Sequence, residues 1–157
     1  MILDVGSGDP RKRLHVLYNG SNALHIDIDR NAYHLEVCCS VNALPFRNAT
    51  FRVVHISHVL EHLSDPMLAL KECKRVSQEY VVAKVPNASR FFNAEDKEHK
   101  MSWNQHSFRN FCETLFPTVV LTCTERRTGS GLLFRTKSFV YTALFRPNEL
   151  VALCKKC

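Results

Sequence analysis

Short apolar runs alternate with amphipathic stretches over the first half of the chain. The runs that we expect to form strands are residues 1–5, 22–28, 37–40, 51–57 and 79–86. Strands that alternate with helices are typical of a parallel sheet covered by helices. The pattern therefore predicts an α/β fold.

Residues 65–77 have the clearest helical pattern. Asp65 can cap this helix and Pro66 suits its first turn, because proline lacks the N–H that the helix leaves unused there. The residues expected on its apolar face are Met67, Leu68, Leu70 and Val76. Two further helices are predicted at 10–18 and 105–116.

The C-terminal half combines a long polar loop with a pair of strands. Residues 87–103 form the loop, and a loop of that length is usually functional or mobile. Strands are predicted at 117–126 and 137–146, joined by a glycine-containing turn. We expect one domain over residues 1–157, without repeats.

The composition is that of a globular protein, with 45% hydrophobic and 10% aromatic residues among 157. No apolar run approaches the roughly 20 residues that cross a bilayer, and Asp4 interrupts any signal-peptide core. We therefore expect a soluble, cytoplasmic protein with no membrane partner. The formal net charge of +6 favours an acidic partner such as RNA, although a solvated basic surface explains it equally well.

Seven cysteines are present, an odd number. In a cytoplasmic protein we expect free, mostly buried thiols. The pair Cys154 and Cys157 has the C-x-x-C spacing of a zinc site, but a zinc ribbon needs a second such pair, which the adjacent Cys38 and Cys39 do not supply. We expect no bound metal.

The stretch His58-Val-Leu-Glu61-His62 has the H-x-x-E-H spacing of a zinc metallopeptidase. On a helix, residues four apart share a face, so two imidazoles could hold a metal while the glutamate activates water. Such an enzyme also needs a distant third ligand. Glu113 and Glu125 are the downstream candidates, and neither lies in a supporting motif.

A glycine turn follows the first predicted strand. Gly6 and Gly8 allow a sharp turn that comes close to a ligand, and Arg11 stands where a dinucleotide-binding motif would have its third glycine. Asp27 ends the second strand, where a carboxylate can accept hydrogen bonds from ribose hydroxyls. Asp29, two residues further on, fits a turn or capping role better.

The segments "ILDVGSGDP", "LHIDID" and "NALPFRNATFRVVHISHVLEHLSDPMLALKECKRV" together resemble class I S-adenosylmethionine-dependent methyltransferases of the type 11 branch. The resemblance covers roughly residues 2–90. It implies a three-layer Rossmann-like sandwich with a mainly parallel seven-stranded sheet. The implied strand order is 3-2-1-4-5-7-6, with strand 7 antiparallel, and the implied cofactor is S-adenosyl-L-methionine.

The resemblance also implies the residues of the cofactor site. The methionine end of the cofactor would be held by Asp4, Gly6, Ser7 and Gly8. Asp27 would bind the ribose, Ile28 would pack on the adenine, and Ser40 and Val41 would lie at the adenine edge. Ser57 and His58 would lie where the transferred methyl group faces the substrate.

Three departures from the family pattern change this picture. Ser40 replaces the usual acidic residue, which weakens the contact with the adenine amino group, and Arg52 stands where aspartate is common. The sequence also starts directly on the first strand, without the usual preceding helices. We expect an open site, a covering partner subunit or second copy of the chain, or a large substrate.

Methyl transfer needs a general base when the acceptor is a hydroxyl or an amine. The candidates are His58 and His62, with Glu61 as the residue that orients a histidine or the substrate. For the substrate wall we expect Asn87, Arg90, His99 and Trp103 on the long loop, although a loop tryptophan often anchors its loop to the core instead. No Asn-Pro-Pro-Tyr-type motif follows the fourth strand, which disfavours that route to base-amino methylation.

The function expected from these features is methyl transfer to a small molecule, an RNA or a protein. One alternative is a catalytically degenerate methyltransferase-fold subunit that binds cofactor or RNA as a partner. The zinc metallopeptidase is the weakest hypothesis, because the flanking "LPF" and "SDP" already account for the histidines as part of the methyltransferase pattern.

Overall fold

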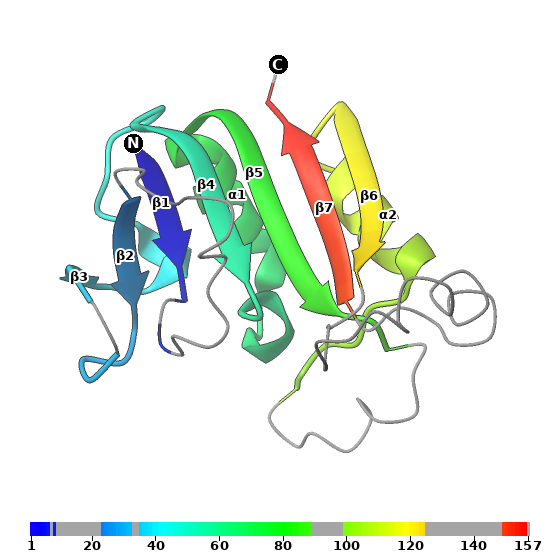
Figure 1. The fold of residues 1–157 in the computed structure, drawn as a ribbon, viewed down its shortest axis with the longest axis horizontal. Helices are drawn as coiled ribbons and strands as arrows, with labels where there is room; N and C mark the ends of the chain where they lie inside the picture. The colour runs from blue at the N-terminus through cyan, green and yellow to red at the C-terminus, as the bar shows by residue number, and fades with distance from the viewer. Residues whose placement is uncertain (7, 9–22, 33–34, 89–98, 125–148, 157) are drawn as a thin grey trace, which may run out of the picture.

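Seven strands form one sheet in the order β3-β2-β1-β4-β5-β7-β6 (Figure 1). The computed structural model describes residues 1–6, 8, 23–32, 35–88, 99–124 and 149–156. The strands are β1 (Ile2–Val5), β2 (Ala23–Asp27), β3 (Val37–Cys38), β4 (Phe51–Ser57), β5 (Ser77–Pro86), β6 (Thr118–Thr124) and β7 (Glu149–Lys155). Strands β1 to β5 pair in parallel, whereas β7 is antiparallel to β5 and β6. The strand order and the antiparallel β7 that the resemblance implies are both confirmed.

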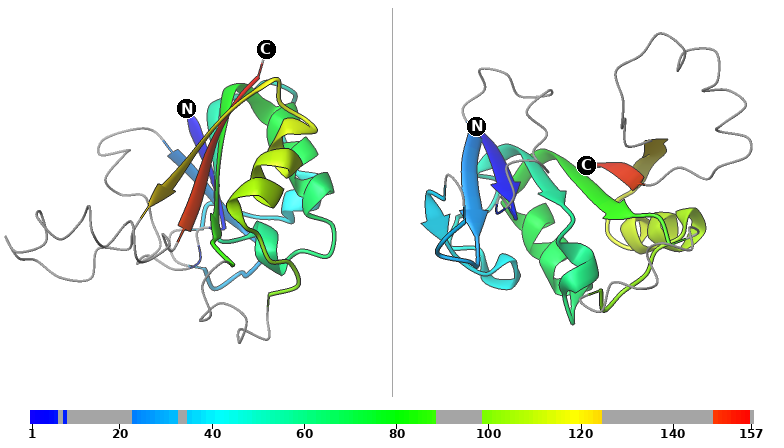
Figure 2. Two further views of the ribbon diagram at one scale, coloured as in Figure 1. Left: turned by 90° about the vertical axis from the view of Figure 1, so that its right-hand side faces the viewer. Right: turned by 60° about the horizontal axis from the view of Figure 1, so that its bottom comes forward.

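Two α-helices cover one face of this sheet (Figure 2). Helix α1 (Pro66–Val76) packs against β4 and β5, and α2 (Gln105–Glu113) packs against β6 and β7. Two short 3-10 helices, η2 (Val41–Ala43) and η3 (Leu60–His62), lie in the connections on either side of β4. The helix predicted at 10–18 lies outside the described residues, as does the central part of the predicted 87–103 loop.

Helix α1 begins as the sequence predicts, and it buries Leu70 and Val76 of the four residues predicted for its apolar face. Oδ1 of Asp65 accepts a hydrogen bond from the backbone N–H of Leu68 (3.0 Å), which makes Asp65 the N-cap. Leu68 itself is 41% exposed, so its predicted place on the apolar face is wrong. The residues that α1 buries follow the helical repeat: Pro66, Ala69, Leu70, Cys73 and Val76.

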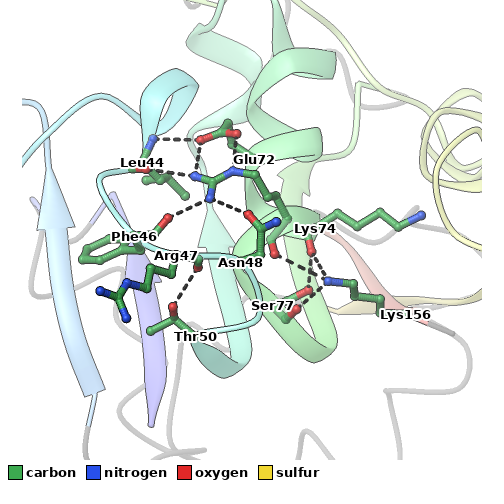
Figure 3. Close-up of polar contacts among 10 residues, drawn as sticks. Leu44, Phe46, Arg47, Asn48, Thr50, Glu72, Lys74, Ser77 and Lys156 are labelled. Carbon is green, nitrogen blue, oxygen red and sulfur yellow. Dashed lines mark hydrogen bonds and ion pairs between the residues drawn. The ribbon is translucent and has the colours of Figure 1, made fainter.

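Arg75 ties α1 to the loop before β4, and Figure 3 shows its partners Leu44, Phe46 and Glu72. Its guanidinium donates to the backbone oxygens of Leu44 (2.9 Å) and Phe46 (2.7 Å) and forms a bidentate pair with Glu72 (2.7 and 2.8 Å). Glu72 in turn accepts from the backbone N–H of Leu44 (2.9 Å). The "LPF" loop and the glutamate and arginine of "ECKRV" therefore form one anchor, and this part of the family pattern maintains the fold.

The residues that form β7 were not predicted as a strand, because the local pattern placed the last strand at 137–146, outside the described residues. Its inward positions are Leu150, Ala152 and Cys154, all fully buried. Two of these three side chains are small, so the apolar alternation is faint. Just beyond the strand, Nζ of Lys156 donates to the backbone oxygens of Lys74 (2.9 Å) and Ser77 (2.8 Å) at the end of α1 (Figure 3).

The cysteines in the described part of the chain are all free thiols, as expected. Cys73, Cys112 and Cys154 are buried, Cys39 and Cys123 are half-buried, and Cys38 is exposed. Burial raises the pKa of the Cys73 thiol to about 12, so this thiol stays protonated at neutral pH. Among the described residues, no helix is long and apolar enough to span a bilayer.

Candidate active site

The carboxyl ends of β1, β2, β4 and β5 meet at one edge of the sheet, the lower edge in Figure 1. Open α/β sheets bind their ligands at this edge, because the loops that follow the strands converge there. The residues that follow the four strands are Gly6, Ile28, His58 and Asn87. Predicted site residues from four separate segments are thus brought together.

Gly6 occupies a position that only glycine fills without strain. Its φ is +80°, and a Cβ there would lie 2.2 Å from Cγ2 of Val59. Its backbone N–H donates to the oxygen of Ile26 (2.9 Å), which closes the turn against β2. The close approach of Val59 also brings the segment after β4 directly against the glycine turn.

Asp27 organises the turn at the end of β2. Oδ2 accepts a hydrogen bond from the backbone N–H of Gly8 (2.9 Å) and Oδ1 accepts one from Asp29 (2.9 Å). A carboxylate has about four acceptor positions, so two remain for the hydroxyls of a ribose. Ile28, the next residue, leaves 74% of its surface exposed, an unusual degree for isoleucine and suited to an apolar ring lying on it.

Asp4 is engaged by two histidines from the strands on either side of β1. Its Oδ1 lies 2.7 Å from Nδ1 of His55 on β4, and its Oδ2 lies 2.9 Å from Nδ1 of His25 on β2. Burial raises the pKa of Asp4, but the two histidines outweigh it and hold the pKa below its usual value. Asp4 is therefore ionised at neutral pH, and its contact with a cofactor stays a prediction.

The predicted adenine edge lies at η2. Oγ of Ser40 accepts from the backbone N–H of Asn42 (3.3 Å) and so caps this 3-10 helix, while the side chain of Val41 is buried in the core. Oδ1 of Asn42 is buried with no hydrogen-bond partner in the described part of the chain. Of the other predicted site residues, Ser7 and Arg90 lie outside the described residues.

The end of β4 holds two predicted residues in unusual settings. Ser57 is 7% exposed, and its hydroxyl has no hydrogen-bond partner among the residues that the structure describes. His58 follows with φ +55°, the left-handed region that side chains with a Cβ rarely adopt, and its N–H donates to the oxygen of Lys84 (2.9 Å). Strain at such a turn is common at functional sites.

His58 lies between two carboxylates. Its Nε2 is 3.2 Å from Oε1 of Glu149 and its Nδ1 is 3.2 Å from Oε1 of Glu61, while Nζ of Lys84 is 2.8 Å from Oε2 of Glu149. Burial lowers the pKa of His58, but Glu149 and Glu61 outweigh it and raise the pKa above its ordinary value. Burial likewise opposes the ionisation of Glu149, yet His58 and Lys84 lower its pKa to about 2.

The His58–Glu61–His62 spacing does not form the metal site of a peptidase helix. His58 precedes η3, a single 3-10 turn, so His58 and His62 do not share the face of an α-helix. His62 instead has its ring beside that of His99, with 4.9 Å between the ring centroids. Glu61 is 1% exposed. One of its carboxylate oxygens lies near His58, and a carboxylate oxygen also lies within 4.8 Å of ring nitrogens of His62 and His99.

Trp103 belongs to the hydrophobic core. It is 5% exposed, and its ring packs against Phe108 (5.6 Å) and Phe111 (4.6 Å) of α2. These contacts support the alternative anchoring role, and the predicted substrate contact of Trp103 stays a prediction. Asn87 pairs its backbone with Trp103 and is 4% exposed, and its substrate role stays a prediction.

Two residues of this region, Lys84 and Glu149, escaped sequence reasoning. They join the predicted residues through contacts between segments far apart in the chain. Glu149 and His58 are 91 positions apart, and no motif or spacing connects them. Only the neighbouring places of β4, β5 and β7 in the sheet bring them together.

Residues 3–80 match the model of a family described as a methyltransferase domain. Together with the strand order and the glycine turn, this match shows that the chain belongs to the class I S-adenosylmethionine-dependent methyltransferases of the type 11 family. A comparison with curated proteins finds no match. The family binds S-adenosylmethionine, which is the cofactor of this fold.

Solved structures of the same fold cover nearly the whole chain. A methyltransferase from Archaeoglobus fulgidus is 21% identical, with 99% of this chain and 85% of that chain covered and a TM-score of 0.70. A putative methyltransferase from Haloferax volcanii, solved with a methyltransferase activator, is 13% identical, with coverages of 98% and 81% and a TM-score of 0.72. The cyclase SpnF is 13% identical, with coverages of 99% and 74% and a TM-score of 0.68.

The described residues fit this cofactor. The Gly6 turn has no room for a side chain, Asp27 retains acceptor positions, and Ile28 offers an exposed apolar surface beside it. The Ser57 hydroxyl and the Asn42 side-chain oxygen are buried polar atoms without a described partner at the same edge of the sheet. A ligand with both apolar and hydrogen-bonding groups satisfies all of these features.

Proposed function

We propose that this chain transfers a methyl group from S-adenosylmethionine to an acceptor that approaches the carboxyl end of β4. The observation that carries the proposal is the contact between Gly6 and Val59, which brings the glycine turn against the segment that holds His58 and His62. Cofactor and acceptor groups would then meet at one place. The acceptor class remains a small molecule, an RNA or a protein.

The cofactor residues have separate roles in this proposal. Asp27 accepts hydrogen bonds from the ribose, and Ile28 covers one side of the adenine. Gly6 and Gly8 let the backbone approach the methionine end, and the ionised Asp4 places a negative charge behind the turn. When bound, the cofactor supplies an electrophilic methyl group, so the protein has mainly to align the acceptor and exclude water.

Among the histidines, His62 is the better candidate for the general base. A base must be neutral to accept a proton, whereas the two carboxylates around His58 stabilise its protonated form. His58 is better suited to hold the turn after β4 and to orient Glu61. His62 is half-buried and keeps its ring close to the surface.

A second candidate function is a methyltransferase-fold subunit that binds cofactor or RNA without turnover. Ser40 favours it, because its hydroxyl caps η2 while the family usually offers a carboxylate to the adenine at this position. The cyclase SpnF also shares this fold, and a fold alone does not define a reaction.

Calorimetry with S-adenosylmethionine and S-adenosylhomocysteine tests the cofactor site. We expect dissociation constants below about 1 mM for both ligands. In Asp27→Ala the affinity should fall roughly tenfold or more, because the acceptor for the ribose hydroxyls is removed. The matched control is Asp29→Ala, since the Asp29 carboxylate accepts a hydrogen bond from the backbone N–H of Asn31 in the same turn. Undetectable binding of both ligands, or equal affinity in Asp27→Ala, would contradict the proposal.

Labelled-methyl transfer separates the enzyme from the degenerate subunit. The protein is incubated with labelled cofactor and with total cell RNA, protein and small-molecule extracts in turn. Label in one fraction identifies the acceptor class and supports the enzyme. Cofactor binding without label in any fraction supports the degenerate subunit instead.

A further inference from the structure

We infer that Glu61, His62 and His99 form a binding site for one divalent transition-metal ion. One ligand atom from each of the three residues, a carboxylate oxygen or a ring nitrogen, lies within 4.8 Å of the others. Ligands held at roughly 2.0–2.2 Å from a common ion are about 3–4.4 Å apart. A small rotation of the histidine side chains therefore brings all three atoms to bonding distance.

The burial of Glu61 points to a cation. Its side chain is 1% exposed, and Oε2 accepts no hydrogen bond from any residue that the structure describes. A buried carboxylate without compensating donors or charge is costly, because the ionised group has lost its water. Nδ1 of His58 lies 3.2 Å from Oε1, and no described residue donates a hydrogen bond to Oε2. An ion between Glu61, His62 and His99 provides the missing compensation.

The backbone holds the third ligand in place. The oxygen of Glu61 accepts hydrogen bonds from the N–H groups of Lys100 (2.8 Å) and Met101 (3.1 Å). Nζ of Lys100 also donates to Oγ of Ser64 (3.0 Å), just beyond η3. These contacts fix the segment that carries His99 against the turn that carries Glu61 and His62. The site is therefore assembled by the fold before any ion arrives.

His58 is not a ligand of the proposed metal ion, but it contacts Glu61, which is one. Its Nδ1 lies 3.2 Å from Oε1 of Glu61, and its Nε2 lies 3.2 Å from Glu149. Metal-binding carboxylates are commonly oriented by such outer hydrogen bonds. The arrangement differs from an H-x-x-E-H peptidase site, in which both histidines of the motif bind the metal. It also departs from the sequence-based expectation of no metal.

Two imidazoles and one carboxylate select zinc, manganese, iron or cobalt over calcium and magnesium, which prefer oxygen ligands. Three protein ligands leave coordination positions open, as in catalytic metal sites. The site itself is independent of methyl transfer. One consequence rests on the proposed function: a bound ion would occupy His62, the candidate base, and lower the pKa of an acceptor hydroxyl that binds to it.

Titration of the metal-free chain with Co²⁺ tests the site, because bound cobalt absorbs visible light according to its ligands. We expect one equivalent to bind, with visible ligand-field bands and no thiolate-to-cobalt band in the near ultraviolet. In His99→Ala and in His62→Ala the dissociation constant should rise roughly tenfold or more. His106→Ala is the control, because this exposed histidine lies on α2 and contacts Asn110.

If Co²⁺ does not bind with a dissociation constant below about 100 µM, the proposal is overturned. It is equally overturned by unchanged affinity in His99→Ala, or by a thiolate band, which would put the ion on cysteines. Because the half-buried His99 can be truncated without emptying the core, this variant keeps the test valid even where Glu61→Gln fails to fold. Cofactor calorimetry on the same metal-free protein reports separately on the methyltransferase proposal, so either one can fail alone.

Discussion

Nε2 of His58 lies 3.2 Å from Oε1 of Glu149, a residue 91 positions further along the chain. Lys84, on the strand between them, holds the other oxygen of Glu149 at 2.8 Å. The pair links the turn after β4 to the first residue of β7 across β5. The strained turn that carries His58 is thus held by charges from two neighbouring strands.

Replacing Glu149 with glutamine should destabilise the protein in a pH-dependent way. The pKa of Glu149 is lowered from 4.5 to about 2, so its carboxylate stabilises the folded state above pH 4.5 and loses that effect as pH falls toward 2. At pH 7 we expect Glu149→Gln to lower the free energy of unfolding by about 2 kcal/mol. Urea unfolding of both proteins from pH 7 to pH 3 measures the difference, which should shrink by about half or more.

A difference that stays constant over this pH range would mean that the side chain acts by packing alone. Glu79→Gln is a suitable control, because Glu79 pairs with Arg52 at an exposed position and such pairs contribute little. Glu79→Gln should change the free energy of unfolding by no more than about 0.5 kcal/mol at every pH.

Alanine at position 6 should disrupt the glycine turn, and a second substitution should partly repair it. Gly6→Ala introduces a Cβ 2.2 Å from Cγ2 of Val59 and forces a side chain into φ +80°. We expect a loss of about 2–3 kcal/mol in the free energy of unfolding. In the Val59→Ala background the clashing methyl group is gone, so Gly6→Ala should there cost only the backbone strain of about 1 kcal/mol.

The measurement is urea unfolding of Gly6→Ala, Val59→Ala and the double variant, analysed as a double-mutant cycle. Additive effects of the two substitutions would show that Val59 does not pack against Gly6. Gly8→Ala is the control, because among the described residues its Cβ would meet the flexible carboxylate of Asp27, with Oδ2 at 3.0 Å, and no positive φ is required.

Arg75→Lys should loosen the anchor between α1 and the loop before β4. Lysine cannot reproduce the bidentate pair with Glu72 or reach both Leu44 and Phe46. We expect a loss of about 2 kcal/mol in the free energy of unfolding, because several charge-assisted hydrogen bonds disappear together. Chemical unfolding checks this value, and the exposed Arg52→Lys should stay within about 0.5 kcal/mol. Equal effects at both positions would refute the anchoring role.

The fold was largely predictable from the sequence because its strands are locally encoded. Residues 51–57 form β4 over the whole predicted range, since a β-branched apolar run bounded by turn residues has few alternatives. Strand β7 was missed because Ala152 and Cys154 bury too little apolar surface to mark an alternation. The family resemblance supplied the strand order, which no local pattern contains.

The site was predictable only where its residues follow a strand directly. Gly6, Asp27 and His58 fall at strand ends, and the shared edge of a parallel sheet brings such residues together. His99 and Glu149 lie far along the chain, and their approach to His62 and His58 depends on long-range packing. The burial of Trp103 was equally hard to predict, because it depends on packing against Phe108 and Phe111 of α2.

Asp4→Asn distinguishes a structural carboxylate from one that only contacts the cofactor. Asparagine lacks the negative charge with which Asp4 engages Nδ1 of both His25 and His55. We therefore expect the free energy of unfolding at pH 7 to fall by about 2 kcal/mol. Because the pKa of Asp4 is lowered from 3.8, the loss should be complete above pH 4 and should shrink as pH falls below that value. Thermal unfolding between pH 3 and pH 7 measures this, and calorimetry at pH 7 measures cofactor affinity. Weaker cofactor binding with unchanged stability would show that the two histidines do not depend on the charge of Asp4.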